Sequence, residues 1–101
     1  MDLVSGSRWK STVCDTEVIV VRPADAARTL GCGGSDMVPV DEEAVAGVLD
    51  PALADGTLLG KRYGDEASGL EVLCTKGGAG TLTLDGQALP VKGAKPLPSS
   101  D

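Results

Sequence analysis

The chain has 101 residues, of which 42% are hydrophobic and 24% charged, a composition typical of one small globular domain. It contains no histidine, which excludes catalytic triads and other imidazole-based chemistry. The formal net charge of −6 argues against nucleic acid as a partner. No apolar run approaches the roughly 18 residues that cross a membrane, and no signal peptide is apparent. We therefore expect a cytoplasmic protein without a membrane partner.

The N-terminal residues 1–7 are expected to be extended, and strands are predicted in both halves of the chain. The β-branched run at 17–21 predicts a strand that ends before Pro23. Residues 70–75 form a second run of this kind, and residues 81–84 alternate between polar and apolar side chains. A hairpin turn is predicted at Asp85-Gly86, followed by a short edge strand at 89–91.

One helix is predicted between these regions, over residues 41–49. Asp41 is a suitable N-cap, the next two residues are glutamates, and apolar residues from position 44 to 49 recur at helical spacing. Pro51 ends this pattern, and a further short turn is predicted over 51–54. No basic residue occurs between Arg28 and Lys61, so this acidic region is either a solvated face or a docking surface for a basic protein partner.

The two halves of the chain resemble each other, which predicts an internal repeat. A unit of this size buries too little apolar surface alone, whereas two stacked units bury enough. The matched positions are Trp9 with Tyr63, Cys14 with Ser68, 17–18 with 71–72, and 29–37 with 81–89. The predicted organisation is a β unit at 1–40, an acidic helical linker at 41–56, a second β unit at 57–92 and an extended Pro- and Ser-rich tail at 93–101, all within one compact domain.

The first unit also resembles a known family. Residues 10–14, followed by a strand and then by 29–37, are similar to the N-terminal pattern of desulforedoxin and desulfoferrodoxin, in which a C-x2-C knuckle and a hairpin precede C-C-G-x-x-M. The resemblance covers Trp9 to Val40 and retains Gly34 and Met37. It implies a mainly β fold of duplicated, rubredoxin- or desulforedoxin-like hairpin units joined by one short helix, with iron bound by four thiolates and pairing as a homodimer.

The cysteine positions depart from the family pattern. Cys14 and Cys32 stand at two of the four ligand positions, whereas Ser11 and Gly33 stand at the other two. Serine is a poor ligand for soft metals and glycine is none, so a four-thiolate site cannot form within this unit. If the knuckles keep their places, Cys14 and Cys32 lie close enough to share a metal or to form a disulfide.

Three interpretations of this cysteine pair stay open: a buried remnant, a disulfide, or an iron or zinc ion completed by water, aspartate or a second chain. Candidate metal ligands are Cys14 and Cys32, with Ser11 and Cys74 as further candidates. Cys74, in the predicted strand 70–75, is otherwise a small buried apolar residue. In the second unit, Ser68 and Leu84 replace both retained cysteines.

Two functions follow from this pattern. The first is a small metal-binding or thiol-redox protein with a reduced two-cysteine site, acting as a homodimer or with a protein partner. The alternative is a β-rich adaptor with a vestigial site, which binds a larger protein through its acidic middle and its tail. A third interpretation is an enzyme, with Cys32 as nucleophile between glycines.

The remaining motifs favour structural roles. The glycine-rich stretches 31–34 and 77–80 do not lead from a strand into a helix with a following Lys-Ser/Thr, so they indicate turns rather than phosphate-binding loops. Trp9 and Tyr63, the only aromatic residues, are expected in the core or between the units, with a ligand-facing platform as the alternative.

Overall fold

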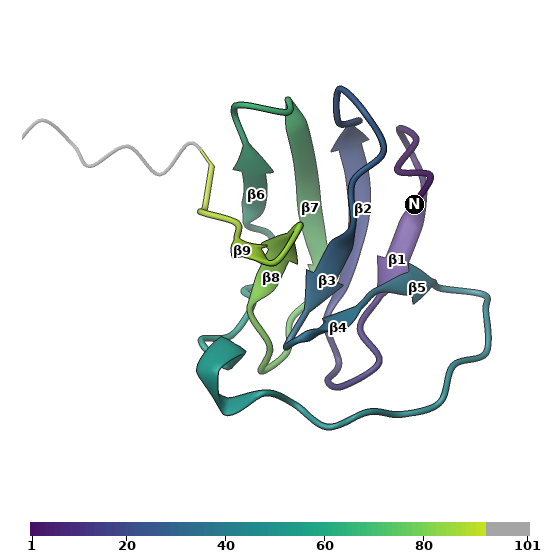
Figure 1. Cartoon of the computed structure of the whole chain (residues 1–101), viewed down its shortest axis with the longest axis vertical. Helices are drawn as coiled ribbons and strands as arrows, with labels where there is room; N and C mark the ends of the chain where they lie inside the picture. Colours follow the sequence, from purple (N-terminus) through teal and green to yellow (C-terminus); the bar gives the residue numbers. More distant parts are fainter. Residues whose placement is uncertain (93–101) are drawn as a thin grey trace, which may run out of the picture.

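The computed structural model describes residues 1–92, which form two antiparallel β-sheets (Figure 1). The larger sheet contains, in spatial order, β5 (Val38–Pro39), β1 (Arg8–Lys10), β2 (Glu17–Arg22), β7 (Leu70–Lys76) and β6 (Arg62–Asp65). The smaller contains β4 (Ser35–Asp36), β3 (Leu30–Cys32), β8 (Leu82–Leu84) and β9 (Gln87–Ala88). The smaller sheet lies across the larger one, and the mainly β prediction is therefore confirmed.

The two halves of the described chain repeat one arrangement of strands. In each half an antiparallel hairpin of the larger sheet, β1–β2 or β6–β7, is followed by a hairpin of the smaller sheet, β3–β4 or β8–β9. At the centre β2 pairs with β7 and β3 pairs with β8. Strand pairing across the centre makes one structural unit from both halves. The desulforedoxin-like character of each half stays a prediction.

The two short hairpin turns of the smaller sheet also match. Gly33 and Gly34 have φ of 64° and 94°, while Asp85 and Gly86 have φ of 51° and 85°. Positive φ at both central residues is the geometry that a two-residue hairpin turn requires. Each turn is tied to the other half, because Gly33 N donates to Thr81 O (3.0 Å) and Asp85 N donates to Thr29 O (2.8 Å).

The core fills the space between the sheets with aliphatic side chains. Alternate residues of β2 and β7 point inward, so Val18, Val20 and Val72 are almost fully buried, and Leu30 and Leu82 meet them from the smaller sheet. Burial of this apolar surface is the main stabilising term of the fold. Other members of the core are Leu3, Trp9, Cys32, Met37, Tyr63, Leu70, Cys74, Leu84 and Leu89.

The aromatic residues Trp9 and Tyr63 belong to this core rather than to an open platform, since they are only 7% and 6% exposed. Their polar atoms are satisfied: Trp9 Nε1 donates to Ser7 Oγ (2.9 Å), and Tyr63 Oη accepts from Leu58 N (3.0 Å). The N-terminal segment also contributes, because Leu3 is buried.

The three main predicted strands are present as β2, β7 and β8, whereas the predicted edge strand at 89–91 is wrong. Strand β9 ends at Ala88, and Val91 forms only an isolated bridge with Tyr63. The predicted turn at 51–54 is present as a short 3-10 helix, η1 (Pro51–Leu53), capped by the Asp50 side chain, which accepts from Ala52 N (2.9 Å).

The predicted helix over 41–49 is wrong, because this segment is irregular and runs along the outside of the molecule (Figure 1). Most of a helix's stability in a protein comes from packing its apolar face, and Val45 and Val48 are 92% and 89% exposed here. Gly47 lowers the helix propensity further. The tail expected at 93–101 lies outside the described residues. Within residues 1–92, no helix has the length and apolarity needed to cross a membrane.

Candidate functional site

The fold brings Cys14 and Cys32 together, as expected if both keep the places that the desulforedoxin-like pattern implies. Cys14 lies in the turn between β1 and β2, and Cys32 is the last residue of β3. Their Sγ atoms are 3.8 Å apart, although the residues are 18 positions apart in the chain. Cys32 is fully buried, whereas Cys14 is partly exposed. The pair therefore has one sulfur within reach of solvent and one covered by protein.

Polar groups from two segments, the turn between β1 and β2 and the loop before β8, surround the Cys14 sulfur. Cys14 Sγ lies 3.4 Å from Ser11 Oγ and 3.3 Å from Thr16 Oγ1, and it accepts a hydrogen bond from Gly80 N at 3.4 Å. Ser11 Oγ also accepts from the amides of Val13 (3.1 Å) and Cys14 (3.2 Å), which fixes the turn. The Cys14 thiol can donate to either hydroxyl, and once it loses its proton both hydroxyls can turn to donate to the sulfur beside the Gly80 amide, which stabilises a thiolate next to the protein interior.

The buried side of the pair is closed by close backbone packing. A Cβ at Gly80 would lie 2.9 Å from Cys32 Sγ and 3.0 Å from Gly33 N, so only glycine fits between these groups. The segment 41–56, which joins the two halves, covers the site from the outside. Its Gly47 N donates to Thr12 O (2.9 Å), and its Asp50 N donates to Gly33 O (2.9 Å). The glycine-rich loop 77–80 is thus a turn that packs on the cysteines.

The two thiols of the pair differ in acidity. Partial burial works against the Cys14 thiolate, but hydrogen bonds from Ser11, Thr16 and the Thr16 and Gly80 amides outweigh it and lower the pKa of Cys14 from 9.0 to about 7. Burial, and then the charge of Cys14, raise the pKa of Cys32 to about 11. At neutral pH about half of the Cys14 thiols are therefore ionised, whereas Cys32 stays a neutral thiol.

This difference predicts a stability maximum near pH 9 for the reduced protein. Between pH 7 and 9 the unfolded state binds the Cys14 proton more tightly than the folded state, so stability rises with pH, by about 1 kcal/mol after allowance for the partial exposure of Cys14. Above pH 9 the Cys32 thiol ionises first in the unfolded state, so stability falls. Urea unfolding in the presence of a reductant, from pH 6 to 10, measures the free energy of unfolding at each pH. In Cys14→Ser the increase between pH 7 and 9 should be absent.

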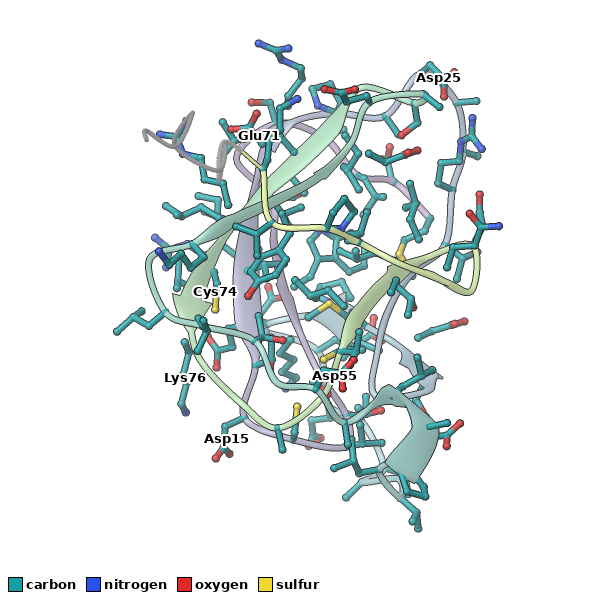
Figure 2. The ribbon with its side chains drawn as sticks, turned by 90° about the vertical axis from the view of Figure 1, so that its left-hand side faces the viewer. Asp15, Asp25, Asp55, Glu71, Cys74 and Lys76 are labelled. Atoms are coloured by element: carbon teal, nitrogen blue, oxygen red, sulfur yellow. The ribbon has the colours of Figure 1, made fainter. Side chains whose placement is uncertain are left out.

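Cys74 does not belong to the pair. It is buried in the middle of β7, opposite Val18 of β2, and its Sγ donates to Lys76 O (3.2 Å). Figure 2 shows Cys74 on its strand, well away from Asp15, the residue that follows Cys14 in the turn. Burial raises the pKa of the Cys74 thiol. Cys74 therefore has the environment of a small core residue.

A complete metal site within one chain does not fit these residues. Among residues 1–92 no group of three or more Cys, Asp or Glu side chains has a metal-binding arrangement. Ser11 Oγ is near Cys14 Sγ but already accepts two amides, and Gly33 has no side chain. One feature is compatible with a metal: two thiolates on a tetrahedral ion at about 2.3 Å are about 3.8 Å apart, which is the separation of this pair.

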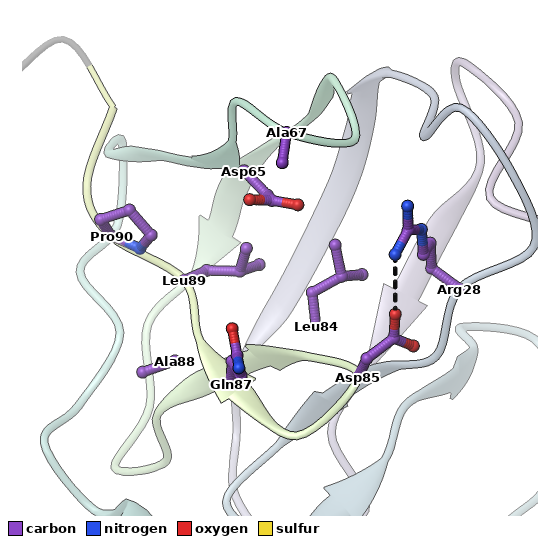
Figure 3. Close-up of a pocket in the computed structure, with 9 residues that line it drawn as sticks. All are labelled: Arg28, Asp65, Ala67, Leu84, Asp85, Gln87, Ala88, Leu89 and Pro90. Atoms are coloured by element: carbon purple, nitrogen blue, oxygen red, sulfur yellow. Dashed lines mark hydrogen bonds and ion pairs between the residues drawn. The ribbon is translucent and has the colours of Figure 1, made fainter.

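The equivalent position in the second half holds a pocket instead of thiols (Figure 3). Ser68 and Leu84 occupy the positions of Cys14 and Cys32, and Leu84 lines a pocket of about 300 Å³. Arg28 stands beside it, with ion pairs to Asp25 (2.9 Å) and Asp85 (3.3 Å). The cysteine pair is therefore present in the first half alone, since Cys74 of the second half stands on β7, away from this position.

Two residues of the site have no counterpart in the sequence prediction. Thr16 follows Cys14 by two positions and is fully buried, and Gly80 comes from the other half of the chain. The only signal for either was local: a hydroxyl residue within the cysteine turn, and a glycine-rich stretch whose small residues permit close approach. Comparison with family models, curated proteins and solved structures finds no match for this chain.

Proposed function

We propose that Cys14 and Cys32 form a redox-active dithiol that exchanges with disulfides of other molecules. The observation that carries this proposal is the contact between a partly exposed thiolate and a buried thiol, with sulfur atoms 3.8 Å apart. A thiol with a pKa near the ambient pH is the most effective attacking group in exchange, and the pKa of Cys14 is about 7.

The reaction has two steps. The Cys14 thiolate attacks one sulfur of a substrate disulfide, forms a mixed disulfide and releases the other sulfur as a thiolate. Cys32 then loses its proton, which the released thiolate takes up, and attacks Cys14 Sγ. The mixed disulfide breaks, the second substrate sulfur leaves as a thiolate that solvent protonates, and a Cys14–Cys32 disulfide forms. One substrate disulfide becomes two thiols, and an external dithiol regenerates the protein.

A second candidate is a zinc or iron ion shared between two copies of the chain, each of which supplies Cys14 and Cys32. The separation of the sulfurs, equal to one edge of a four-thiolate tetrahedron, favours it. The full burial of Cys32 counts against it, since the covering segments would have to move before a metal reaches that sulfur. We therefore rank thiol exchange first.

An aromatic disulfide that releases a coloured thiolate tests the exchange reaction. The reduced wild-type chain should release two coloured thiolates at the pair, Cys32→Ser only one with a retained mixed disulfide, and Cys14→Ser none on the same timescale. Cys74→Ser is the matched control and should behave as wild type. A single release from wild type, with no disulfide formed, would contradict the proposal.

Titration of the reduced protein with zinc or ferrous iron under anaerobic conditions tests the metal candidate. A shared site predicts half an equivalent of tightly bound metal per chain, a dimer by mass measurement and loss of both in Cys14→Ser. A monomer without bound metal would exclude this candidate and leave the exchange reaction intact.

A further inference from the structure

In the second step of the proposed exchange, Cys32 attacks Cys14 Sγ, and this step requires a group that stabilises a thiolate at Cys32. Its sulfur must carry negative charge while it attacks Cys14, yet Cys32 has no exposed surface through which water could solvate that charge. A thiolate in such surroundings needs an internal hydrogen-bond donor. If the proposed thiol exchange holds, a nearby side chain must supply this donor to the Cys32 sulfur.

The Thr16 hydroxyl is placed to serve both sulfurs. Its Oγ1 lies 3.3 Å from Cys14 Sγ, and Cys32 Sγ lies 3.8 Å from the same sulfur, so the hydroxyl stands beside the atom that Cys32 must attack. Thr16 is fully buried, and Gly78 packs so closely on it that a Cβ there would lie 2.5 Å from Oγ1. The backbone is fixed as well, because Ser11 N donates to Thr16 O (2.8 Å). The hydroxyl is thus held next to the pair and kept from bulk water.

We propose that Thr16 is a positioning residue whose hydroxyl hydrogen bonds first to the Cys14 thiolate and then, once Cys14 is joined to substrate, to the Cys32 sulfur as it attacks. The switch needs a rotation about the C–O bond, since a hydroxyl hydrogen turns freely, and it accompanies the approach of Cys32 Sγ toward Cys14 Sγ from 3.8 Å. It also has a direction, because a sulfur in a mixed disulfide is neutral and accepts hydrogen bonds weakly.

Ser11 is less suited to this role. Its Oγ accepts the amides of Val13 and Cys14, and these two hydrogen bonds tie the hydroxyl to the turn that holds Cys14. Loss of Ser11 would therefore disturb the position of Cys14 itself. Thr16 Oγ1 makes no hydrogen bond to the backbone within the described residues, so removal of its hydroxyl leaves the turn intact and tests the hydrogen bond to sulfur alone.

Two matched variants separate the hydroxyl from the methyl group of Thr16. Thr16→Val keeps the shape and removes the hydroxyl, and Thr16→Ser keeps the hydroxyl and removes the methyl. With the aromatic disulfide, the first coloured release reports attack by Cys14 and the second reports resolution by Cys32. We expect Thr16→Val to slow the second, concentration-independent release about tenfold, and Thr16→Ser to stay within about twofold of wild type.

Several results would overturn the inference. One is a second release in Thr16→Val at the wild-type rate, and another is a slower release in Thr16→Ser than in Thr16→Val, which would assign a packing role to the methyl group. If Thr16→Val does not fold, Thr16→Ala removes the same hydroxyl and is read in the same way. A wild-type chain that gives no second release contradicts the exchange reaction itself, so the two failures are distinguishable.

Discussion

Iodoacetamide at pH 7 is expected to alkylate Cys14 on the order of 100-fold faster than Cys32, before any further protection by burial. At this pH about half of Cys14 is ionised if its pKa is about 7, against roughly one part in ten thousand of Cys32 if its pKa is about 11. The lower basicity of the Cys14 thiolate reduces its nucleophilicity about 50-fold, which leaves a net advantage of about 100-fold.

Peptide mapping by mass spectrometry after timed quenching measures this ratio. Cys74 is an internal control in the same molecule, since burial raises its pKa and it should react slowly. In Cys14→Ser no thiol should be alkylated on the wild-type timescale. Equal labelling of all three cysteines in the folded protein would contradict the assignment of Cys14 as the reactive thiol.

Oxidation of the pair is expected to raise the free energy of unfolding by about 3 kcal/mol. A disulfide between Cys14 and Cys32 joins residues 18 positions apart, and the loss of chain entropy in the unfolded state sets this magnitude. The sulfurs must approach from 3.8 Å to about 2.05 Å, within turns that already hold the two residues in contact.

Urea unfolding of the oxidised and reduced forms gives this difference directly. Cys74→Ser should show the same gain, whereas Cys14→Ser and Cys32→Ser should not respond to the oxidant. An oxidised protein that is less stable than the reduced one would mean that the turns resist the bond, and the site would then be better described as a pair of fixed thiols.

The sequence predicts the long strands well because their signal is local. Strands β2 and β7 are runs of β-branched and aliphatic residues, and the turn at Asp85-Gly86 has a characteristic composition. The short strands β1, β3 and β6 carry no such signal, since each has only three or four residues and is held by its neighbours in the sheet. Tertiary pairing decides these elements, which local propensity does not report.

For the predicted helix over residues 41–49 the local signal is present, but the fold does not support it. Residues 41–49 have helical periodicity, but Val45 and Val48 face solvent and find no surface to cover. The backbone here instead bonds to the segments that hold the two cysteines: Gly47 N donates to Thr12 O, and the adjoining Asp50 N donates to Gly33 O. A periodic apolar pattern therefore predicts a helix only where the fold offers it a packing surface.

For the site, the proximity of Cys14 and Cys32 was expected from the resemblance to the desulforedoxin pattern, which places both residues at ligand positions of one site. The structure has Cys14 in the turn before β2 and Cys32 at the end of β3. The resemblance did not predict which thiol is ionised. That difference depends on the burial of Cys32 and on the Thr16 and Gly80 groups around Cys14, which come from segments up to 66 residues apart. Contacts of this range are visible only in the folded chain.

Equilibration of the protein with glutathione redox buffers at pH 7, followed by disulfide mapping, shows whether Cys14 and Cys32 act as a redox pair. We expect a single two-electron transition that links Cys14 to Cys32, with Cys74 free at every ratio of reduced to oxidised glutathione. Mixed disulfides with glutathione that never close to a Cys14–Cys32 bond, or a bond that involves Cys74, would contradict this expectation.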